Sequence, residues 1–300
     1  MGLPRVDERA MTNEEERHAI VMTLFGVLPV NIQEKLEDFH KEGFLNIVID
    51  NRTKLTGEEI NGRKEISKVA KVINNKNHGL IAGALNKGIK HAIKLKADLI
   101  TLLDQDSEVE GSQIRILGKS LSSSGSNCLI GPKIIDIWRK NKNLKKICRQ
   151  FGLKPTRMLI SSGTTFRSID WPALGPMNEE MGIDYVDHHW CFRASERGFR
   201  CLTNEAVELV QTFGEKHPNW LCHHLGMQLY SPERHYHALR NLLWLARQPS
   251  TPIVISIKET AKMLLKAPLW VLCEPQRAKN IQAIKGALLH PLPVKSGTSN

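Results

Sequence analysis

Short apolar runs alternate with longer amphipathic stretches along the first third of the chain. Four runs lack an alternating polar face, which is typical of strands buried on both faces of a sheet: residues 18–27, 45–51, 69–73 and 99–104. Residues 31–42 and 80–96 place apolar side chains three or four positions apart and predict helices. Residues 53–67 are polar and predict a loop. This order predicts an α/β domain with a mainly parallel central sheet.

The α/β pattern continues to about residue 210. Helices are predicted at 112–121 and 190–196, strands at 127–131 and 201–210, and an apolar stretch at 159–166 surrounds three small residues.

Beyond residue 226 the pattern is helical only. Ser231 is a good N-cap with Pro232 at the first helical position, and two more helices are predicted at 258–265 and 275–289. The chain is therefore expected to divide into a tail at 1–17, an α/β domain at 18–226, a helical extension at 227–290 and a tail at 291–300.

Two carboxylates, Asp104 and Asp106, stand at the end of the apolar run that begins at Leu99. Open α/β sheets place their ligand crevice at the carboxyl ends of the strands. Neighbouring acids repel one another unless a cation lies between them, and Mg²⁺ is commonly held by one or two carboxylates together with phosphate oxygens. The residues alone leave two interpretations open: a metal site that holds a diphosphate, or a pair that caps the following turn and faces water.

The chain carries a net charge of +11, which suits an anionic partner such as a phosphorylated substrate, an anionic membrane or a nucleic acid. A basic segment at 133–157 contains one acid, Asp136, and is interpreted either as solvated surface or as a binding surface. Its basic residues include Arg139, Lys140, Lys142, Lys145, Lys146, Arg149 and Lys154. No nucleic-acid motif accompanies the charge, so we expect no nucleic-acid partner.

Cysteine usage and hydropathy indicate a cytoplasmic protein. The six cysteines are scattered without a C-x-x-C pair, so neither a disulfide framework nor a zinc site is expected. The charged N-terminus lacks the apolar core of a signal peptide. Apolar runs are too short or too interrupted to span a bilayer, so a membrane role would be peripheral.

Several motifs occur in an order that resembles the inverting glycosyltransferases of family 2, and in particular the bacterial rhamnosyltransferases that build cell-surface polysaccharide such as lipopolysaccharide O-antigen. The motifs are Ile49-Asp50-Asn51, Asn77-x-Gly79 with Asn86-x-Gly88, Leu102-Leu103-Asp104-Gln105-Asp106-Ser107, Ser161-Ser162-Gly163, Ile183-Asp184-Tyr185-Val186-Asp187-His188-His189-Trp190, His223-x-Leu225-Gly226 and Ser231-Pro232-x-Arg234 with Arg240-Asn241.

This resemblance implies a GT-A fold, which is a nucleotide-sugar-binding α/β/α sandwich with a helical C-terminal extension. It implies dTDP-L-rhamnose as donor, Mg²⁺ or Mn²⁺ as cofactor, and a lipid-linked saccharide acceptor at the anionic inner face of the cell membrane. Asp187 matches the catalytic base, and the metal ligands match Asp104, Asp106 and His223. A base fits the chemistry, because an acceptor hydroxyl is a weak nucleophile until a carboxylate takes its proton.

The remaining site residues carried over from the resemblance fall into two groups. Those expected to bind the donor nucleotide are Thr23, Asp50, Asn51, Asn77, Gly79, Asn86 and Gln105. Those expected near the acceptor or the diphosphate are Ser162, Gly163, Asp184, Trp190, Arg234 and Arg240.

Each assignment has a plainer alternative. Asp187 could cap the helix that follows it, and Asp184 could be the base in its place. His223 could be a surface histidine, and Arg234 and Arg240 could simply support their helix.

The sequence departs from the family pattern in three places. Thr23 is followed by Leu24 and Phe25 where Thr-Tyr-Asn is usual, Arg52 stands in the usual Asp-Asn-Gly-Ser, and His189 replaces a Glu. The first two departures border the expected nucleoside pocket, so a UDP-hexose donor is an alternative. A non-catalytic basic protein that binds a membrane or nucleic acid is the alternative from another class.

Overall fold

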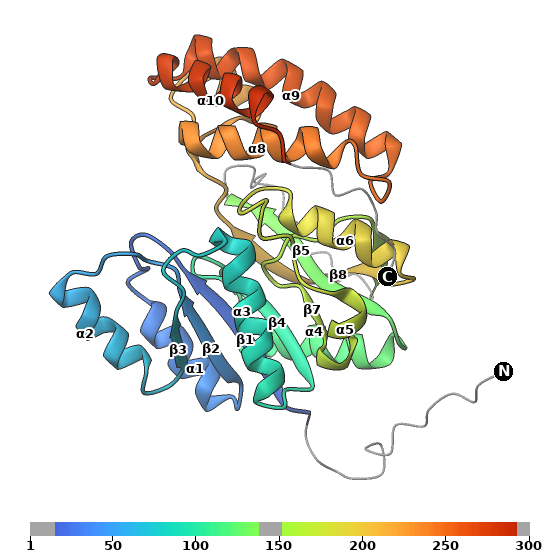
Figure 1. The fold of residues 1–300 in the computed structure, drawn as a ribbon. Helices are drawn as coiled ribbons and strands as arrows, with labels where there is room; N and C mark the ends of the chain where they lie inside the picture. Colours follow the sequence, from blue (N-terminus) through green and yellow to red (C-terminus); the bar gives the residue numbers. More distant parts are fainter. Residues whose placement is uncertain (1–15, 138–151, 293–300) are drawn as a thin grey trace.

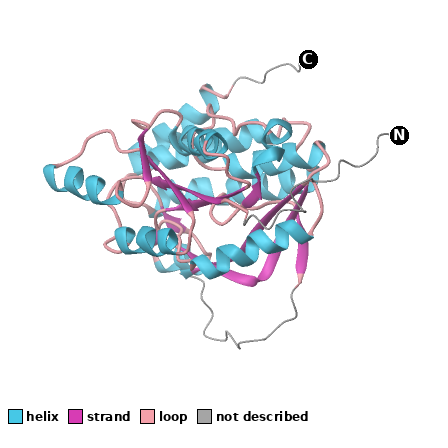
Figure 2. Cartoon of the chain, turned by 90° about the horizontal axis from the view of Figure 1, so that it is seen from below, coloured by secondary structure: helices cyan, strands magenta, loops and turns pink. Residues whose placement is uncertain are grey.

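The computed structural model describes residues 16–137 and 152–292 (Figures 1 and 2). Within them, eight strands form one sheet in the order β3-β2-β1-β4-β7-β5-β8-β6. The first four are mutually parallel: β1 (His18–Leu24), β2 (Leu45–Asp50), β3 (Lys71–Asn74) and β4 (Leu99–Asp104). The predicted parallel arrangement is confirmed for this half.

The other half of the sheet is mixed. Strand β7 (Thr165–Arg167) is antiparallel to both β4 and β5 (Cys128–Asp136), and β5 is parallel to β8 (Arg200–Gln211). Strand β6 (Leu153–Thr156) runs antiparallel to β8 at the edge. A separate antiparallel pair joins β9 (Glu215–Lys216) to β10 (Gln228–Leu229).

Helices cover both faces of the sheet, which explains why the central strands β1 and β4 are buried along almost their whole length. In β1, Ala19 and Val21 belong to the core on one face, and Ile20 and Met22 to the core on the other. One face is covered by α3 (Leu80–Lys94), α5 (Trp171–Leu174) and α6 (Val186–Glu196), and the other by α1 (Ile32–Lys41), α2 (Gly57–Ile66) and α4 (Gly111–Ser123). The molecule is therefore the predicted α/β/α sandwich.

The C-terminal helices form a layer of their own at one end of the molecule, with α8 (Pro232–Leu245) facing the sheet and α9 (Ile253–Cys273) and α10 (Arg277–Leu289) beyond it (Figure 1). Their core is a separate apolar cluster that includes Leu242, Met263 and Trp270. The Ser231 side chain accepts the Arg234 N–H at 3.3 Å, so the predicted N-cap is confirmed. Helix α9 is longer than the predicted 258–265.

The predicted loop at 53–67 is wrong, because residues 57–66 form α2. Thr56 and Glu59 build a capping box, in which each side chain accepts the other residue's backbone N–H. Only Ile66 of this helix is buried, so the segment has no apolar stripe for periodicity to detect. Its helical start depends on the cap and not on burial.

Two expectations fall outside the described residues. Most of the basic segment, including Lys140, Lys142, Lys145 and Lys146, lies in the gap between 137 and 152, and most of both tails lies beyond the ends. Across residues 16–137 and 152–292, the longest apolar stretch of any helix is insufficient to cross a membrane.

Candidate active site

The carboxyl ends of β1, β2, β3 and β4 bring polar residues to one edge of the sheet. In the strand register, Thr23 of β1 is opposite Asp104 of β4, and Asp50 of β2 is opposite Asn74 of β3. The predicted convergence of Thr23, Asp50 and Asp104 at the strand ends is therefore present in the fold, at the position where open α/β sheets bind ligands.

Asp104 and Asp106 face a common space with Asp187. Burial of its carboxyl, and then the charges of Asp106 and Asp187, raise the pKa of Asp104 to about 7. Gln211, at the end of β8, donates from Nε2 to Asp106 Oδ1 at 3.0 Å and to Asp104 Oδ2 at 3.5 Å. An amide thus bridges two acids that repel one another, and the charge of Arg234 and a hydrogen bond from Thr23 further favour the ionised form of Asp104.

The loop that carries Asp104 and Asp106 is held by hydrogen bonds to Lys35 and to neighbouring side chains. Lys35 of α1 donates to the backbone oxygens of Gln105, at 3.3 Å, and Ser107, at 2.9 Å. The Ser107 hydroxyl is bonded to Ser162 and donates to Gln211 Oε1 at 3.1 Å. Ser162, predicted on the acceptor side, therefore supports the acidic loop.

The chemistry of this donor set fits a hard divalent cation, since two carboxylates converge and one of them has a pKa raised partly by the other. Among the described residues, however, no three His, Cys, Asp or Glu side chains gather closely enough to hold a metal ion by themselves. His223, on the short helix α7 (Trp220–His224), therefore does not complete a three-ligand site with Asp104 and Asp106. Phosphate oxygens of a donor would have to supply the other ligands.

Asp187 is the second residue of α6, and the residue in the N-cap position is Tyr185. Its Oδ2 accepts the Ser161 N–H at 3.3 Å, and its Oδ1 accepts the His188 N–H at 2.8 Å. Asp187 therefore satisfies one free donor of the first helical turn without being the cap residue. Within the described residues, the Asp187 carboxylate makes no ion pair that would hold it away from the hydroxyl of an acceptor.

Asp184 is engaged differently. Its two oxygens accept from Arg234 of α8, with the Nη2–Oδ1 distance at 3.0 Å and the Nε–Oδ2 distance at 3.2 Å. The Arg234 guanidinium also lies over the Tyr230 ring, 4.3 Å from its centroid. This geometry fixes a positive charge near Asp104 and leaves Asp184 less free than Asp187 to accept a proton.

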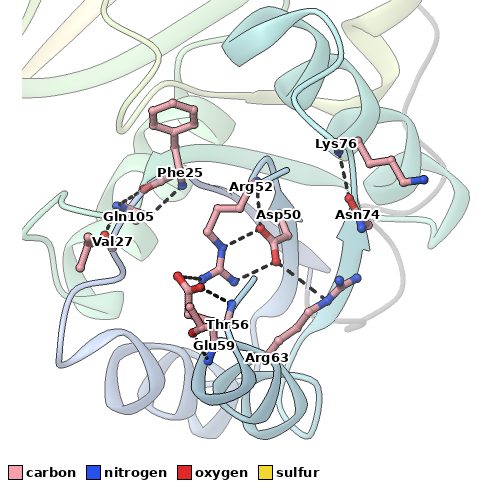
Figure 3. A network of polar contacts seen from close by, with 10 residues as sticks. All are labelled: Phe25, Val27, Asp50, Arg52, Thr56, Glu59, Arg63, Asn74, Lys76 and Gln105. Atoms are coloured by element: carbon pink, nitrogen blue, oxygen red, sulfur yellow. Dashed lines mark hydrogen bonds and ion pairs between the residues drawn. The ribbon is translucent and has the colours of Figure 1, made fainter. Parts of the chain in front are cut away.

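Asp50 is occupied by a neighbour that the family pattern lacks (Figure 3). Arg52 donates to both of its oxygens, from Nε to Oδ1 and from Nη2 to Oδ2, each at 2.9 Å. Glu59 and Arg63 extend the network from α2, at 3.4 Å from Arg52 and 3.9 Å from Asp50. The Asp50 carboxylate, predicted to contact the nucleoside, is therefore engaged on both oxygens in a buried ion pair.

Gln105 holds the turn after β1. Its Nε2 donates to the backbone oxygens of Phe25 and Val27 at 2.8 and 2.9 Å, and its Oε1 accepts the Phe25 N–H at 3.0 Å (Figure 3). A side chain expected to bind the nucleotide thus joins the turn after β1 to the loop after β4.

Asn51 and Gly79 order the start of α3, and Asn86 joins α3 to the segment at Met177. Asn51 donates to the Leu80 oxygen at 3.0 Å, and Asn86 donates to the Met177 oxygen at 2.9 Å. Gly79 has a φ of 65°, and a Cβ there would lie 2.9 Å from the Gly83 Cα, so only glycine fits. Asn77 is different, because its buried Oδ1 has no partner among the described residues.

Three residues predicted near the acceptor or the diphosphate make contacts within the protein. Trp190 is 1% exposed, donates to the Gly175 oxygen at 3.0 Å and packs against Phe166, so its side chain is part of the core. Arg240 donates to the Glu180 oxygen at 2.8 Å and so supports the loop before α6. Gly163, with a φ of 84°, lies where a Cβ would meet the Pro132 ring at 2.5 Å.

Sequence reasoning missed two residues that position the site. Gln211 lies one residue beyond the predicted strand 201–210, and nothing local marks a glutamine there as a partner of Asp104 and Asp106. Asn241, buried in α8, donates to the backbone oxygens of Met181, Ile183 and Asp184. The sequence offered one indication of this role, because Asn241 belongs to the motif Ser231-Pro232-x-Arg234 with Arg240-Asn241.

Known proteins resemble this chain in sequence and in fold. The profile of the family described as glycosyl transferase family 2 matches residues 32–175. The dTDP-rhamnosyl transferase RfbF of Shigella flexneri is 28% identical over 264 residues, which cover 84% of this chain and 87% of the relative.

Solved structures share the fold at low sequence identity. The mannosyltransferase PcManGT of Pyrobaculum calidifontis, in complex with GDP-Man and Mn²⁺, matches with a TM-score of 0.55 and 15% identity, over 96% of this chain and 77% of its own. TarS 1–349 of S. aureus, in complex with UDP-GlcNAc, matches with a TM-score of 0.54 and 13% identity, over 91% and 80%. GalNAc-T7 with UDP, GalNAc and Mn²⁺ matches with a TM-score of 0.56 and 12% identity, over 93% and 59%.

Proposed function

The chain carries a glycosyl transferase family 2 domain in a GT-A fold and is a glycosyltransferase, and from this premise we propose that it transfers L-rhamnose from dTDP-L-rhamnose to a hydroxyl of a lipid-linked glycan. The acceptor would be a growing cell-surface polysaccharide, such as an O-antigen, at the cytoplasmic face of the membrane. Support for the donor comes from the match to RfbF over most of both chains.

The observation that carries the proposed mechanism is the proximity of Asp187 to Asp104 and Asp106 at the strand ends, where the charges of Asp106 and Asp187 both raise the pKa of Asp104. In this mechanism the Asp187 carboxylate accepts the proton of the acceptor hydroxyl, whose oxygen then attacks the sugar carbon. The bond from that carbon to the diphosphate oxygen breaks on the opposite side, so the configuration inverts and no covalent sugar–enzyme intermediate is needed. Asp187 keeps its orientation through the backbone N–H groups of Ser161 and His188.

The departing diphosphate needs positive charge, and the site offers two sources. Asp104 and Asp106 would hold Mg²⁺ or Mn²⁺, which stabilises the negative charge that develops on the leaving group. Arg234 is a fixed cation of the protein itself, held by Asp184 and Tyr230. We infer that Arg234 assists departure from the side of α8, and that Asp184 positions Arg234 and does not accept the proton.

A UDP-hexose donor is the second candidate, and one observation favours weighing it. The Arg52–Asp50 pair lies at the strand end where the resemblance places the nucleoside contact of Asp50. A changed pocket wall at this point is compatible with a changed base preference.

A donor panel tests the proposal. Purified protein is incubated with Mn²⁺, a generic saccharide acceptor and, in turn, dTDP-L-rhamnose, UDP-glucose, UDP-N-acetylglucosamine and GDP-mannose, and glycosylated product is measured by mass spectrometry. We expect a mass gain of one deoxyhexose with dTDP-L-rhamnose alone. Transfer from a UDP-hexose without transfer from dTDP-L-rhamnose would replace the first proposal with the second.

A further inference from the structure

Helix α9 exposes a continuous apolar stripe on its outer side. Six large apolar side chains are each between 63% and 73% exposed: Ile253, Val254, Ile257, Leu264, Leu265 and Leu272. At 3.6 residues per turn they fall within about one third of the helix circumference. The residues that pack inward, Ser256, Met263 and Trp270, recur every seven positions on another side. Single exposed apolar residues are ordinary, but a stripe along 21 residues marks an interaction surface.

Basic residues border this stripe. Lys258, Lys262 and Lys266 recur every four positions and so form a row along one edge of the exposed apolar side. Helix α10 adds three further basic residues, Arg277, Lys279 and Lys285. Five of these six residues are exposed, and Lys266 is half-buried.

The two acids of this helical pair are both turned inward. Glu274 is 3% exposed and accepts from His235 at 2.9 Å and from Asn280 at 3.1 Å. The Glu259 side chain is 18% exposed and is held by Lys262 at 2.6 Å and by the Tyr185 hydroxyl at 3.5 Å. The outer surface of α9 and α10 therefore combines apolar side chains with positive charge and carries no fully exposed acid.

From this combination we propose that α9 lies flat on an anionic lipid surface, with its apolar stripe in the headgroup region and its lysine row against lipid phosphates. An amphipathic helix with one apolar side and lysines on its polar face binds membranes in this manner without crossing them. A second copy of this chain fits less well, because a two-fold contact through the same surface would place like charges opposite one another.

The placement of α9 connects this surface to the crevice. Helix α8 of the same layer carries Arg234, which binds Asp184, and Glu259 of α9 accepts from Tyr185, two residues before Asp187. Docking through the outer side of α9 would therefore place the lipid surface beside the helical layer that carries Arg234. The membrane contact stands on α9 alone, and only its use in delivering a lipid-linked acceptor rests on the proposed function.

Vesicle sedimentation with the full chain tests the surface. Wild type is mixed with vesicles of phosphatidylglycerol and phosphatidylcholine, or of phosphatidylcholine alone, and the bound fraction is measured. We expect binding to the anionic vesicles and weak binding to the neutral ones. Leu264→Ser with Leu265→Ser should reduce binding to anionic vesicles by a factor on the order of 10. Lys258→Gln with Lys262→Gln should reduce it as well, and added salt should deepen the loss.

The matched control replaces exposed isoleucines elsewhere, Ile60→Ser with Ile169→Ser, which are 45% and 80% exposed on α2 and before α5. Binding of this control should equal that of wild type, and circular dichroism checks that all variants fold. Equal vesicle binding by wild type and the Leu264→Ser/Leu265→Ser variant would overturn the proposal. The proposal would also be overturned if wild type bound no vesicles but formed a dimer that the Leu264→Ser/Leu265→Ser variant does not form. Transfer to a water-soluble acceptor, measured in parallel, separates a failed membrane surface from a failed transferase.

Discussion

Arg52 and Asp50 form a bidentate ion pair at the carboxyl end of β2, with both nitrogen–oxygen distances at 2.9 Å and both side chains no more than 4% exposed. Buried pairs of this kind cost desolvation when they form, and removing one partner leaves an uncompensated charge. Together with Glu59 and Arg63, the pair therefore links the carboxyl end of β2 to α2.

A double-mutant cycle tests this pair. Asp50→Asn and Arg52→Gln should each lower the free energy of unfolding by about 3 kcal/mol, because each strands the other partner in the interior. The double variant should lose less than the sum of the two, by about 1 kcal/mol or more. Chemical denaturation monitored by fluorescence measures all four corners. Additive losses would show that the two side chains act independently.

The acids of the crevice are expected to serve binding and not folding. Asp104→Asn and Asp106→Asn remove repulsion between neighbouring carboxylates, so the melting temperature without ligand should not fall. Addition of Mn²⁺ and dTDP should raise the melting temperature of wild type and leave that of each variant unchanged. A thermal-shift titration measures this, and metal-stimulated transfer at the wild-type rate in either variant would remove these acids from the site.

Gln211 offers a test of positioning. Gln211→Leu keeps the size of the side chain but removes the amide that bridges Asp104 and Asp106. Loss of a partner that orients metal ligands typically costs 10–100-fold in metal affinity. We therefore expect the Mn²⁺ concentration that gives half-maximal transfer to rise by a factor on the order of 10 or more. Gln211→Glu is the contrasting variant, since it retains the shape and adds a carboxylate. Unchanged Mn²⁺ dependence in Gln211→Leu would mean that the acids hold their positions without the amide.

The predictable parts of the fold are the elements whose burial requires a regular pattern of apolar residues. The strands at Leu45–Asp50 and Leu99–Asp104 are apolar on both faces because helices cover both, and α3 shows its stripe because it packs on them. Helix α2 was invisible to this reasoning, since its capping box and not an apolar face establishes it.

The site was predictable only as far as single motifs reach. The position of Asp104 and Asp106 at the end of a buried strand follows from the sequence, but the bridging Gln211 lies more than 100 residues away and carries no local mark. Trp190 shows the converse, because its motif pointed to a ligand whereas packing against Phe166 places it in the core. Contacts between distant segments decide such roles, and no short pattern records them.

The central claim is that Asp187 takes the proton of the acceptor, and Asp187→Asn measured beside Asp184→Asn tests it most directly. Asparagine keeps the shape and, through its single amide oxygen, one of the two bonds from the Ser161 and His188 N–H groups, but it cannot accept a proton at neutral pH. With saturating dTDP-L-rhamnose and acceptor, Asp187→Asn should keep the affinity for donor and the melting temperature, and should lose kcat by a factor on the order of 10²–10⁴. Asp184→Asn, which only weakens the hold on Arg234, should retain most of the rate. A dead Asp184→Asn beside an active Asp187→Asn would contradict the account and move the base by three residues.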